Sequence, residues 1–135
     1  MLFSRITNVF LQENMIFVYG KKCKISKVYF SDNKYVYDKF NYLVNKDDTK
    51  CRSRIEINFK NNTIRIETKG SSEVLTYTFS KYTVIDEEGH NIEFMFEDGY
   101  EIESATLILG TWRNELFLRV LEIITKNRDN RIQYN

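Results

Sequence analysis

The chain has 135 residues, of which 42% are hydrophobic and 15% aromatic, so its composition excludes an intrinsically disordered protein. The apolar residues come in short alternating runs, and no uninterrupted run is long enough to cross a bilayer as a helix. The formal net charge of +1 conceals an asymmetry: residues 1–70 hold fourteen Lys or Arg against seven Asp or Glu, whereas residues 71–135 hold six against twelve.

The N-terminal segment MLFSRITNVFLQ predicts a short amphipathic helix over residues 1–12, because its apolar residues recur at three- and four-residue spacing. Arg5 and Asn8 interrupt the apolar stretch that a signal peptide requires, and no small-residue cleavage site follows. A secreted domain stabilised by disulfides usually carries more cysteines than Cys23 and Cys51. These features predict a cytoplasmic protein with reduced thiols.

Residues 14–109 predict a single barrel-like antiparallel sheet of about seven or eight strands. Strands over 15–19 and 23–30 are expected to pair through a turn at residues 20–22. The segment RIEINFKNNTIRIE predicts a second hairpin with a two-residue turn at Asn61 and Asn62, which puts every apolar residue on one face. The expected opposite pairs are Phe59 with Ile64 and Ile57 with Ile66.

The acidic stretch DEEGHNIEFMFEDGYEIE, residues 86–103, predicts the middle of a three-stranded meander. Three-residue loops at 87–89 and 97–99, each with Gly in the left-handed position, keep the acidic side chains off the core face. The expected opposite pairs are Tyr82 with Phe94, Val84 with Ile92, Phe94 with Ile102, Phe96 with Tyr100 and Glu93 with Glu103.

The end of the chain predicts a helix that closes one end of the barrel. Changes in the apolar phase indicate a bulge or tight turn near Ser80 and a second break near Ser104. Thr111 is a suitable N-cap, and an apolar arc with an opposite ladder of alternating charges predicts an amphipathic helix over residues 111–127. Residues 128–135, part of the tail NRDNRIQYN, are expected to be frayed.

Residues 21–39, KKCKISKVYFSDNKYVYDK, resemble the basic second strand, short polar turn and aromatic third strand of a pleckstrin-homology-like domain. The helix expected from Trp112 is similar in place to the one that closes that family's barrel. The chain departs from the family in having its tryptophan at the first turn of this helix and in its N-terminal helix. An eight-stranded calycin-like barrel is the alternative fold, although the first strand lacks the Gly-x-Trp of that group.

The acidic residues form the first candidate site, a protein-docking face. Like charges that face each other across a strand pair cost stability unless solvent or a partner screens them. Such a face suits a basic protein, or an inhibitor of the anti-defence type from a virus or mobile element that mimics nucleic acid. A second copy, through its lysine-rich half, is another candidate partner. The alternative is that these side chains only hydrate the barrel. The residues are Asp86, Glu87 and Glu88 on one rim, and Glu93, Glu101 and Glu103 on the face.

The basic half offers two other candidates. Lys21, Lys22, Lys24 and Lys27 form an anion-binding site, because the resemblance implies that this loop can hold phosphate, including that of an anionic lipid headgroup. Nucleic acid is the other, since aromatic residues that can stack on bases are interleaved with Lys, although the acidic half would repel a long duplex. The interleaved residues are Tyr29, Lys34, Tyr35, Tyr37, Lys39, Phe40 and Tyr42.

Metal binding and catalysis have little support in the sequence. Asp86, Glu88 and His90 alternate, but Gly89 turns the chain between them and no calcium-loop or zinc spacing is present. His90 is the only histidine, and there is no nucleophile motif. The sequence therefore predicts a non-catalytic interaction module without metal or cofactor, which binds another macromolecule through charged faces. The alternatives are a barrel that binds a small ligand or anionic lipid, and a small hydrolase.

Overall fold

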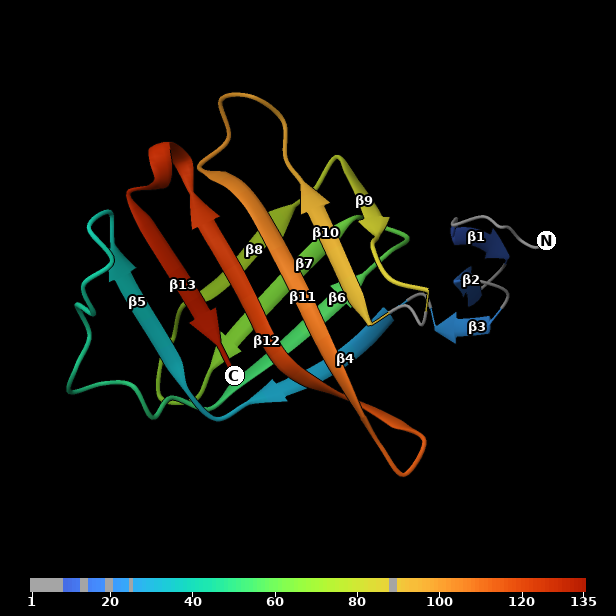
Figure 1. The fold of residues 1–135 in the computed structure, drawn as a ribbon, viewed down its shortest axis with the longest axis horizontal. Coiled ribbons are helices and arrows are strands. Elements are labelled where there is room, and N and C mark those ends of the chain that lie inside the picture. The colour runs from blue at the N-terminus through green and yellow to red at the C-terminus, as the bar shows by residue number, and fades with distance from the viewer. Residues whose placement is uncertain (1–8, 13–14, 19–20, 25, 88–89) are drawn as a thin grey trace.

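The computed structural model describes residues 9–12, 15–18, 21–24, 26–87 and 90–135, with side chains from Ser26 onward (Figure 1). Its elements are almost all strands, and they form three antiparallel sheets. The smallest sheet lies to one side of the other two (Figure 1). It consists, in order, of β1 (Val9–Gln12), β2 (Met15–Val18) and β3 (Lys21–Lys24).

The two larger sheets pack face to face as a sandwich, with the six-stranded sheet in front in Figure 1 and the strands crossing obliquely. The four-stranded sheet contains, in order, β4 (Ser26–Ser31), β6 (Ser53–Asn58), β7 (Thr63–Thr68) and β8 (Val74–Thr78). The six-stranded sheet contains, in order, β5 (Lys34–Asp38), β13 (Asn130–Tyr134), β12 (Glu115–Thr125), β11 (Ile102–Trp112), β10 (Asn91–Met95) and β9 (Lys81–Val84).

The core lies between these two sheets and follows from the two-residue alternation of the strands. In β6, Ile55 and Ile57 are fully buried, whereas Glu56 between them is only partly buried and points outward. The facing sheet contributes side chains such as Phe94 and Leu121, which are also fully buried. Burial of each such apolar side chain contributes about 1.5–3 kcal/mol. The alternation therefore fixes which face of each sheet is apolar.

The prediction of a barrel-like single sheet is wrong, and so is the calycin-like alternative, because the chain passes between the two larger sheets three times: between β4 and β5, between β5 and β6, and between β8 and β9. At the first crossing, the backbone N–H groups of Asp32 and Asn33 donate to the carbonyl of Asn135, at 2.8 and 2.9 Å. The break expected near Ser80 is the last crossing, where the Ser80 N–H donates to the Met95 carbonyl at 2.8 Å.

The prediction of a C-terminal helix over 111–127 is also wrong, since these residues form the end of β11, a turn and β12. The part of the chain that the structure describes contains no α-helix, and its one helical turn is the 3₁₀ segment η1 (Lys126–Arg128). A register shift between Ile108 and Leu109 places Leu118 and Leu121, three residues apart, on the same buried face. This irregularity in β12 imitates helical spacing.

The tail expected to be frayed instead forms β13, which is inserted between β5 and β12. Tyr134 is fully buried, and Ile132 packs against the core. The N-terminal helix expected over 1–12 is wrong where it can be compared, because residues 9–12 form β1; residues 1–8 lie outside the described residues. Lys21 and Lys22, expected in a turn, begin β3.

The hairpin of β6 and β7 forms, but its register differs from the predicted one: Ile57 pairs with Ile64 and Ile55 with Ile66. The turn is longer because Asn58 Oδ1 accepts hydrogen bonds from the N–H groups of residues 60 and 61, at 3.0 and 2.9 Å. An Asx turn of this kind competes with continuation of the strand.

The pairing of β9 with β10 is confirmed, with Val84 opposite Ile92 and Tyr82 opposite Phe94. The pairing of β10 with β11 is not as predicted, because Phe94 lies opposite Ala105. Residues 96–101 form a wider loop than expected, in which the rings of Phe96 and Tyr100 stack with centroids 5.6 Å apart. The predicted break near Ser104 is confirmed as a register shift between Ile102 and Ser104.

Candidate functional site

Strands β11 and β12 extend beyond their neighbours as a two-stranded arm (Figure 1). Strand β10 pairs with β11 only as far as Ile108, and β13 pairs with β12 only from Leu121 onward. The ladder between the two long strands nevertheless continues to the pair Trp112 and Glu115. The arm therefore projects from the sandwich as a two-stranded ladder.

A two-residue turn formed by Arg113 and Asn114 closes the arm. Their φ angles are 49° and 66°, so both central residues are in the left-handed conformation that suits the twist of a hairpin. Asn tolerates this conformation better than Arg does. The Arg113 guanidinium lies 5.7 Å from the centroid of the Trp112 ring, a cation–π contact of the kind that contributes about 0.5–1 kcal/mol at exposed sites.

The tip of the arm exposes three large apolar side chains. Trp112 is 68% exposed, Phe117 46% and Leu116 36%. Together with Glu115 they line a shallow hollow of about 330 Å³. Contiguous exposed apolar side chains of this size are characteristic of interaction sites rather than of ordinary surface.

The Phe117 ring occupies the space that a side chain at Gly110 would fill. The two residues are opposite each other in the ladder, and the Phe117 ring lies directly on the glycine. A Cβ atom added to Gly110 would lie 2.7 Å from Phe117 Cε1, which is closer than van der Waals contact allows. Gly110 does not have a positive φ, so the close approach of the ring is what requires glycine here.

The sequence did not indicate this arm, because its turn lacks the Asn-Gly or Asp-Gly pair that marks a tight hairpin. The one local indication was Asn114, a residue that favours the left-handed conformation, between two apolar runs. The β-branched residues of β12, Val120, Ile123, Ile124 and Thr125, were a second indication.

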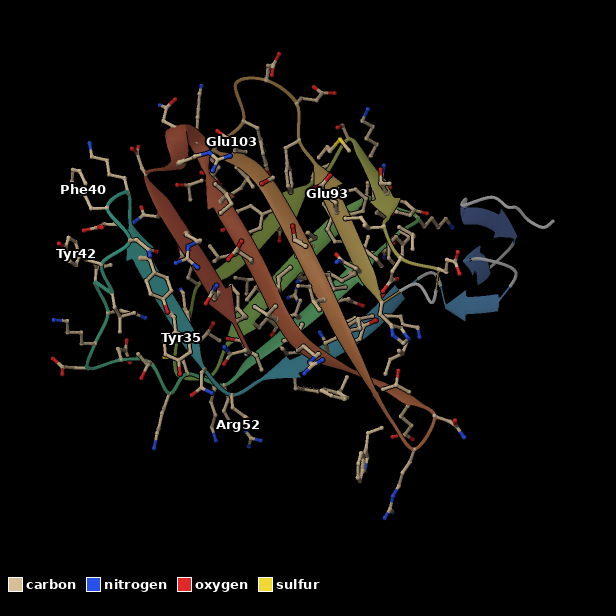
Figure 2. All side chains as sticks on the ribbon, in the orientation of Figure 1. Tyr35, Phe40, Tyr42, Arg52, Glu93 and Glu103 are labelled. Carbon is tan, nitrogen blue, oxygen red and sulfur yellow. The ribbon has the colours of Figure 1, made fainter. Side chains whose placement is uncertain are left out.

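The predicted acidic face is arranged differently from the expected register. Glu93 lies on the outer face of the six-stranded sheet between Thr83 and Thr106, rather than opposite Glu103. Glu103 is at the β11 register shift, where its Oε2 lies 3.4 Å from Arg128 Nε. Figure 2 shows Glu93 and Glu103 on different strands of this sheet, and Arg52 at the opposite end of the molecule from Glu103. Glu101 is exposed in the loop that precedes β11.

Of the first acidic rim, Asp86 stabilises its own loop. Asp86 Oδ1 accepts hydrogen bonds from the N–H groups of His90 and Asn91, at 2.6 and 3.2 Å. His90 Nε2 lies 3.2 Å from Thr111 Oγ1. Glu87 is exposed, and Glu88 lies outside the described residues. Within the described ranges, no group of three or more His, Cys, Asp or Glu side chains is close enough to hold a metal ion.

The basic residues and aromatic residues are dispersed over several elements. Lys21, Lys22 and Lys24 lie in β3, and Lys27 lies in β4. Of the interleaved aromatic residues, Tyr29 is buried in the core, whereas Phe40 and Tyr42 are 69% and 71% exposed on the loop after β5 (Figure 2). The other members of the set are Tyr35 and Tyr37, which are partly buried on β5, and the Arg131 guanidinium lies 4.2 Å from the Tyr37 ring centroid.

Three titratable side chains, Cys51, Tyr77 and Tyr134, have raised pKa values that favour their neutral forms. Burial and the adjacent Asp48 raise the pKa of the Cys51 thiol, whose Sγ lies 3.1 Å from the Asp48 carbonyl oxygen. Burial raises the pKa of Tyr77 to about 12 and also raises the pKa of Tyr134. A protonated thiol is a poor nucleophile, so this arrangement does not favour catalysis by Cys51.

No protein-family model, curated protein or solved structure matches the chain. The predicted resemblance to pleckstrin-homology-like domains therefore remains an untested prediction. None of the helical segments that the structure describes has the length and apolarity needed to span a membrane.

Proposed function

We propose that the protein is a non-catalytic interaction module that binds another protein through the tip of the β11–β12 arm. The observation that carries this proposal is the exposure of Trp112, Leu116 and Phe117 at the end of a hairpin that projects from the sandwich. Trp and other large aromatic residues dominate the binding energy of protein interfaces when a pocket in the partner buries them. The arm is thus suited to insertion into an apolar pocket.

The geometry supports binding with little loss of conformational entropy on the side of this chain. The left-handed turn, the contact of Arg113 with Trp112 and the packing of Phe117 on Gly110 all restrict the tip before a partner arrives. Ordered side chains lose less rotamer freedom on association. Charged residues at the rim, Glu115 and Arg119, allow electrostatic selection of the partner. Recognition through the acidic residues Glu93, Glu101 and Glu103 is a separate proposal that the same experiment tests.

The experiment is site-specific photocrosslinking in the native host, with p-benzoylphenylalanine in place of Leu116. We expect a discrete adduct with one protein, and we expect Trp112→Ala in the same chain to abolish it. The crosslinker placed at Lys46, an exposed loop residue remote from the arm, serves as the control and should not give that adduct. A second variant, with Glu93, Glu101 and Glu103 changed to Lys, tests the acidic residues.

The purified partner is then mixed with protein labelled with 5-fluorotryptophan. Trp112 is the only tryptophan, so it gives a single ¹⁹F resonance that reports on the tip. We expect this resonance to shift in proportion to the bound fraction, and Phe117→Ala to weaken binding by about tenfold or more. If the adduct persisted in Trp112→Ala but disappeared in the acidic triple variant, the acidic residues would be the binding site. That result would contradict the role of the arm.

A further inference from the structure

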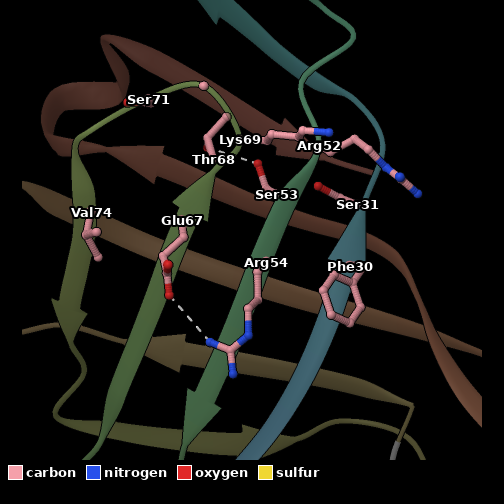
Figure 3. A pocket seen from close by; sticks show the side chains of 11 residues that line it. Phe30, Ser31, Arg52, Ser53, Arg54, Glu67, Thr68, Lys69, Ser71 and Val74 are labelled. Carbon is pink, nitrogen blue, oxygen red and sulfur yellow. Dashed lines mark hydrogen bonds and ion pairs between the residues drawn. The ribbon is translucent and has the colours of Figure 1, made fainter.

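A groove of about 550 Å³ lies on the outer side of the four-stranded sheet, near the end where β6 and β7 meet their loops (Figure 3). Phe30 on β4 and Val74 on β8 lie on its two sides, with Arg54 and Glu67 on the strands between them. Three strand spacings separate the two walls, a width of about 14 Å. A groove of this volume matches the size of sites that bind small molecules.

The groove carries an excess of positive charge. Its lining contains Arg52, Arg54 and Lys69 against the single carboxylate of Glu67. Arg65 also donates a hydrogen bond to that carboxylate, and Arg54 Nη1 lies 3.5 Å from it. Asp32 and Glu56 also pair with Arg52 and Arg54, so four cations, with Arg65 counted, stand against three carboxylates, and the groove keeps an excess of one positive charge.

Arg52 is available to a ligand at little cost. Its Nε lies 3.2 Å from Asp32 Oδ1, and both side chains are 74% exposed. An ion pair in such an exposed position contributes little to stability, so the guanidinium can turn to an anion in the groove. Arg52 and Lys69 are joined at the backbone, where the Lys69 N–H donates to the Arg52 carbonyl at 2.8 Å. Two cationic side chains therefore begin from adjacent positions at one end of the groove.

Hydroxyl groups lie on the inner side of the sheet at the same end of the groove. Ser53 Oγ and Thr68 Oγ1 are 3.0 Å apart and form a hydrogen bond across β6 and β7. Ser31 also lines the groove, and although its side chain is buried, its Oγ has no hydrogen-bond partner among the described residues. Ser31 and Ser53 share the inward phase of the buried Tyr29 and Ile55, so these hydroxyl groups face the interior and are not contacts for a ligand on the outer face.

The side of the groove formed by β4 is aromatic. Phe30 is 70% exposed, an unusual environment for phenylalanine in a strand, and the opposite wall is formed by Val74, which is 43% exposed. A flat ring system can stack on Phe30 while its polar edge faces Arg54 and Glu67, a donor and an acceptor side by side. The groove thus combines an anion site with a stacking site.

We infer that this groove binds a small anionic ligand with a flat ring, of the class of nucleoside monophosphates. Arg52 and Lys69 hold the phosphate, Phe30 stacks on the ring, and Arg54 and Glu67 contact its polar edge. The inference rests on residues of the four-stranded sheet and is independent of the arm. Phe30 and Val74 bound the groove on two sides about 14 Å apart, which is room for one nucleotide, so the inference is for a free small molecule.

The test is titration calorimetry at physiological salt with three probes: inorganic phosphate, adenosine and adenosine 5′-monophosphate. We expect the nucleotide to bind about tenfold or more tightly than either half alone, because only it engages both subsites. Phe30→Ala should reduce nucleotide affinity about tenfold and leave phosphate binding unchanged. Arg52→Gln with Lys69→Gln should weaken the nucleotide and phosphate together.

Matched control variants lie elsewhere on the molecule. Phe40 is 69% exposed, almost as much as Phe30, and Lys46 is an exposed cation outside the groove. Phe40→Ala and Lys46→Gln should therefore leave nucleotide affinity unchanged. Equal losses in the groove variants and these controls, or no binding by the nucleotide, would overturn the inference. Tighter binding of a 5′-phosphorylated oligonucleotide than of the mononucleotide would overturn its assignment to a small molecule.

Discussion

At the scale of single residues, the contact between Gly110 and Phe117 determines the geometry of the arm tip. In an ordinary strand position, replacement of glycine by alanine stabilises the fold by reducing the entropy of the unfolded chain. Here the added methyl group would occupy the space of the Phe117 ring, which is half-exposed and can swing away only by losing its packing. The usual benefit of the substitution and the cost of the displaced ring therefore oppose each other.

We expect Gly110→Ala to destabilise the fold by about 1 kcal/mol, because the clash outweighs the entropic gain. In the Phe117→Ala background the same substitution should instead stabilise it by about 0.5 kcal/mol. Urea unfolding of the four proteins in this double-mutant cycle measures the coupling directly. Additive effects of the two substitutions would show that the ring does not lie on the glycine.

At the scale of elements, the C-terminal strand β13 joins two parts of the six-stranded sheet. It pairs with β12 through residues Tyr134 to Arg131 and with β5 along its whole length. The backbone of Asn135 also bonds to Asp32 and Asn33, where the chain crosses between sheets. Loss of β13 would therefore separate β5 from the sheet.

We expect Gln133→Pro to destabilise the fold by about 3 kcal/mol or more, because proline cannot donate to a ladder in a central strand. Gln133→Thr is the matched control, since it removes the hydrogen bond to Glu122 but keeps the backbone donor and a strand-forming residue. Thermal unfolding compares the two variants. If the proline variant and the control melted at the same temperature, β13 would not be an integral strand.

The elements also show how far local sequence patterns could lead. The alternation in β6 and β7 marked their core face, and the pairing of β9 with β10 followed from matching apolar positions. The pattern failed at β12, where the register shift puts Leu118 and Leu121 on one face and so imitates a helix. It failed at β13 because five residues with charged and polar members become a strand only when β5 and β12 flank them. Such long-range pairing leaves no trace in the local sequence.

The candidate sites show the same limit, because the local sequence reveals only groups of residues that are close along the chain. The acidic residues and the lysines were visible in the sequence because they are close along the chain. The arm tip needs a turn that brings Trp112 beside Phe117, and the groove needs β4, β6, β7 and β8 side by side. Phe30, Arg52, Lys69 and Val74 are distant in sequence, so only the strand order of the four-stranded sheet brings them together.

At the scale of the whole molecule, burial of tyrosine hydroxyls in the core determines how stability depends on alkaline pH. Burial, and then the charge of Glu101, raise the pKa of Tyr77 to about 12. Burial likewise raises the pKa of Tyr134, whose hydroxyl has no hydrogen-bond partner among the described residues. Both phenol groups are therefore neutral in the folded protein, and folding disfavours their ionised forms.

In the unfolded chain these tyrosines ionise at a pKa of about 10, whereas in the folded protein they stay neutral to higher pH. The unfolded state thus releases protons first, so the free energy of unfolding is unaffected below about pH 10 and falls as the pH rises from there towards about 12. For Tyr77 the loss amounts to about 2–3 kcal/mol over that interval.

We expect the midpoint of urea unfolding to fall steeply between about pH 10 and pH 11, the accessible part of this range. Tyr77→Phe should make the decline shallower, because phenylalanine has no proton to release in either state. Tyr134→Phe should do the same, and it should not destabilise the protein at neutral pH, since it removes a hydroxyl whose burial is uncompensated. Tyr42→Phe is the control: this tyrosine is 71% exposed, so its replacement should leave the alkaline slope unchanged. An alkaline slope that was the same in all four proteins would mean that other groups govern the transition.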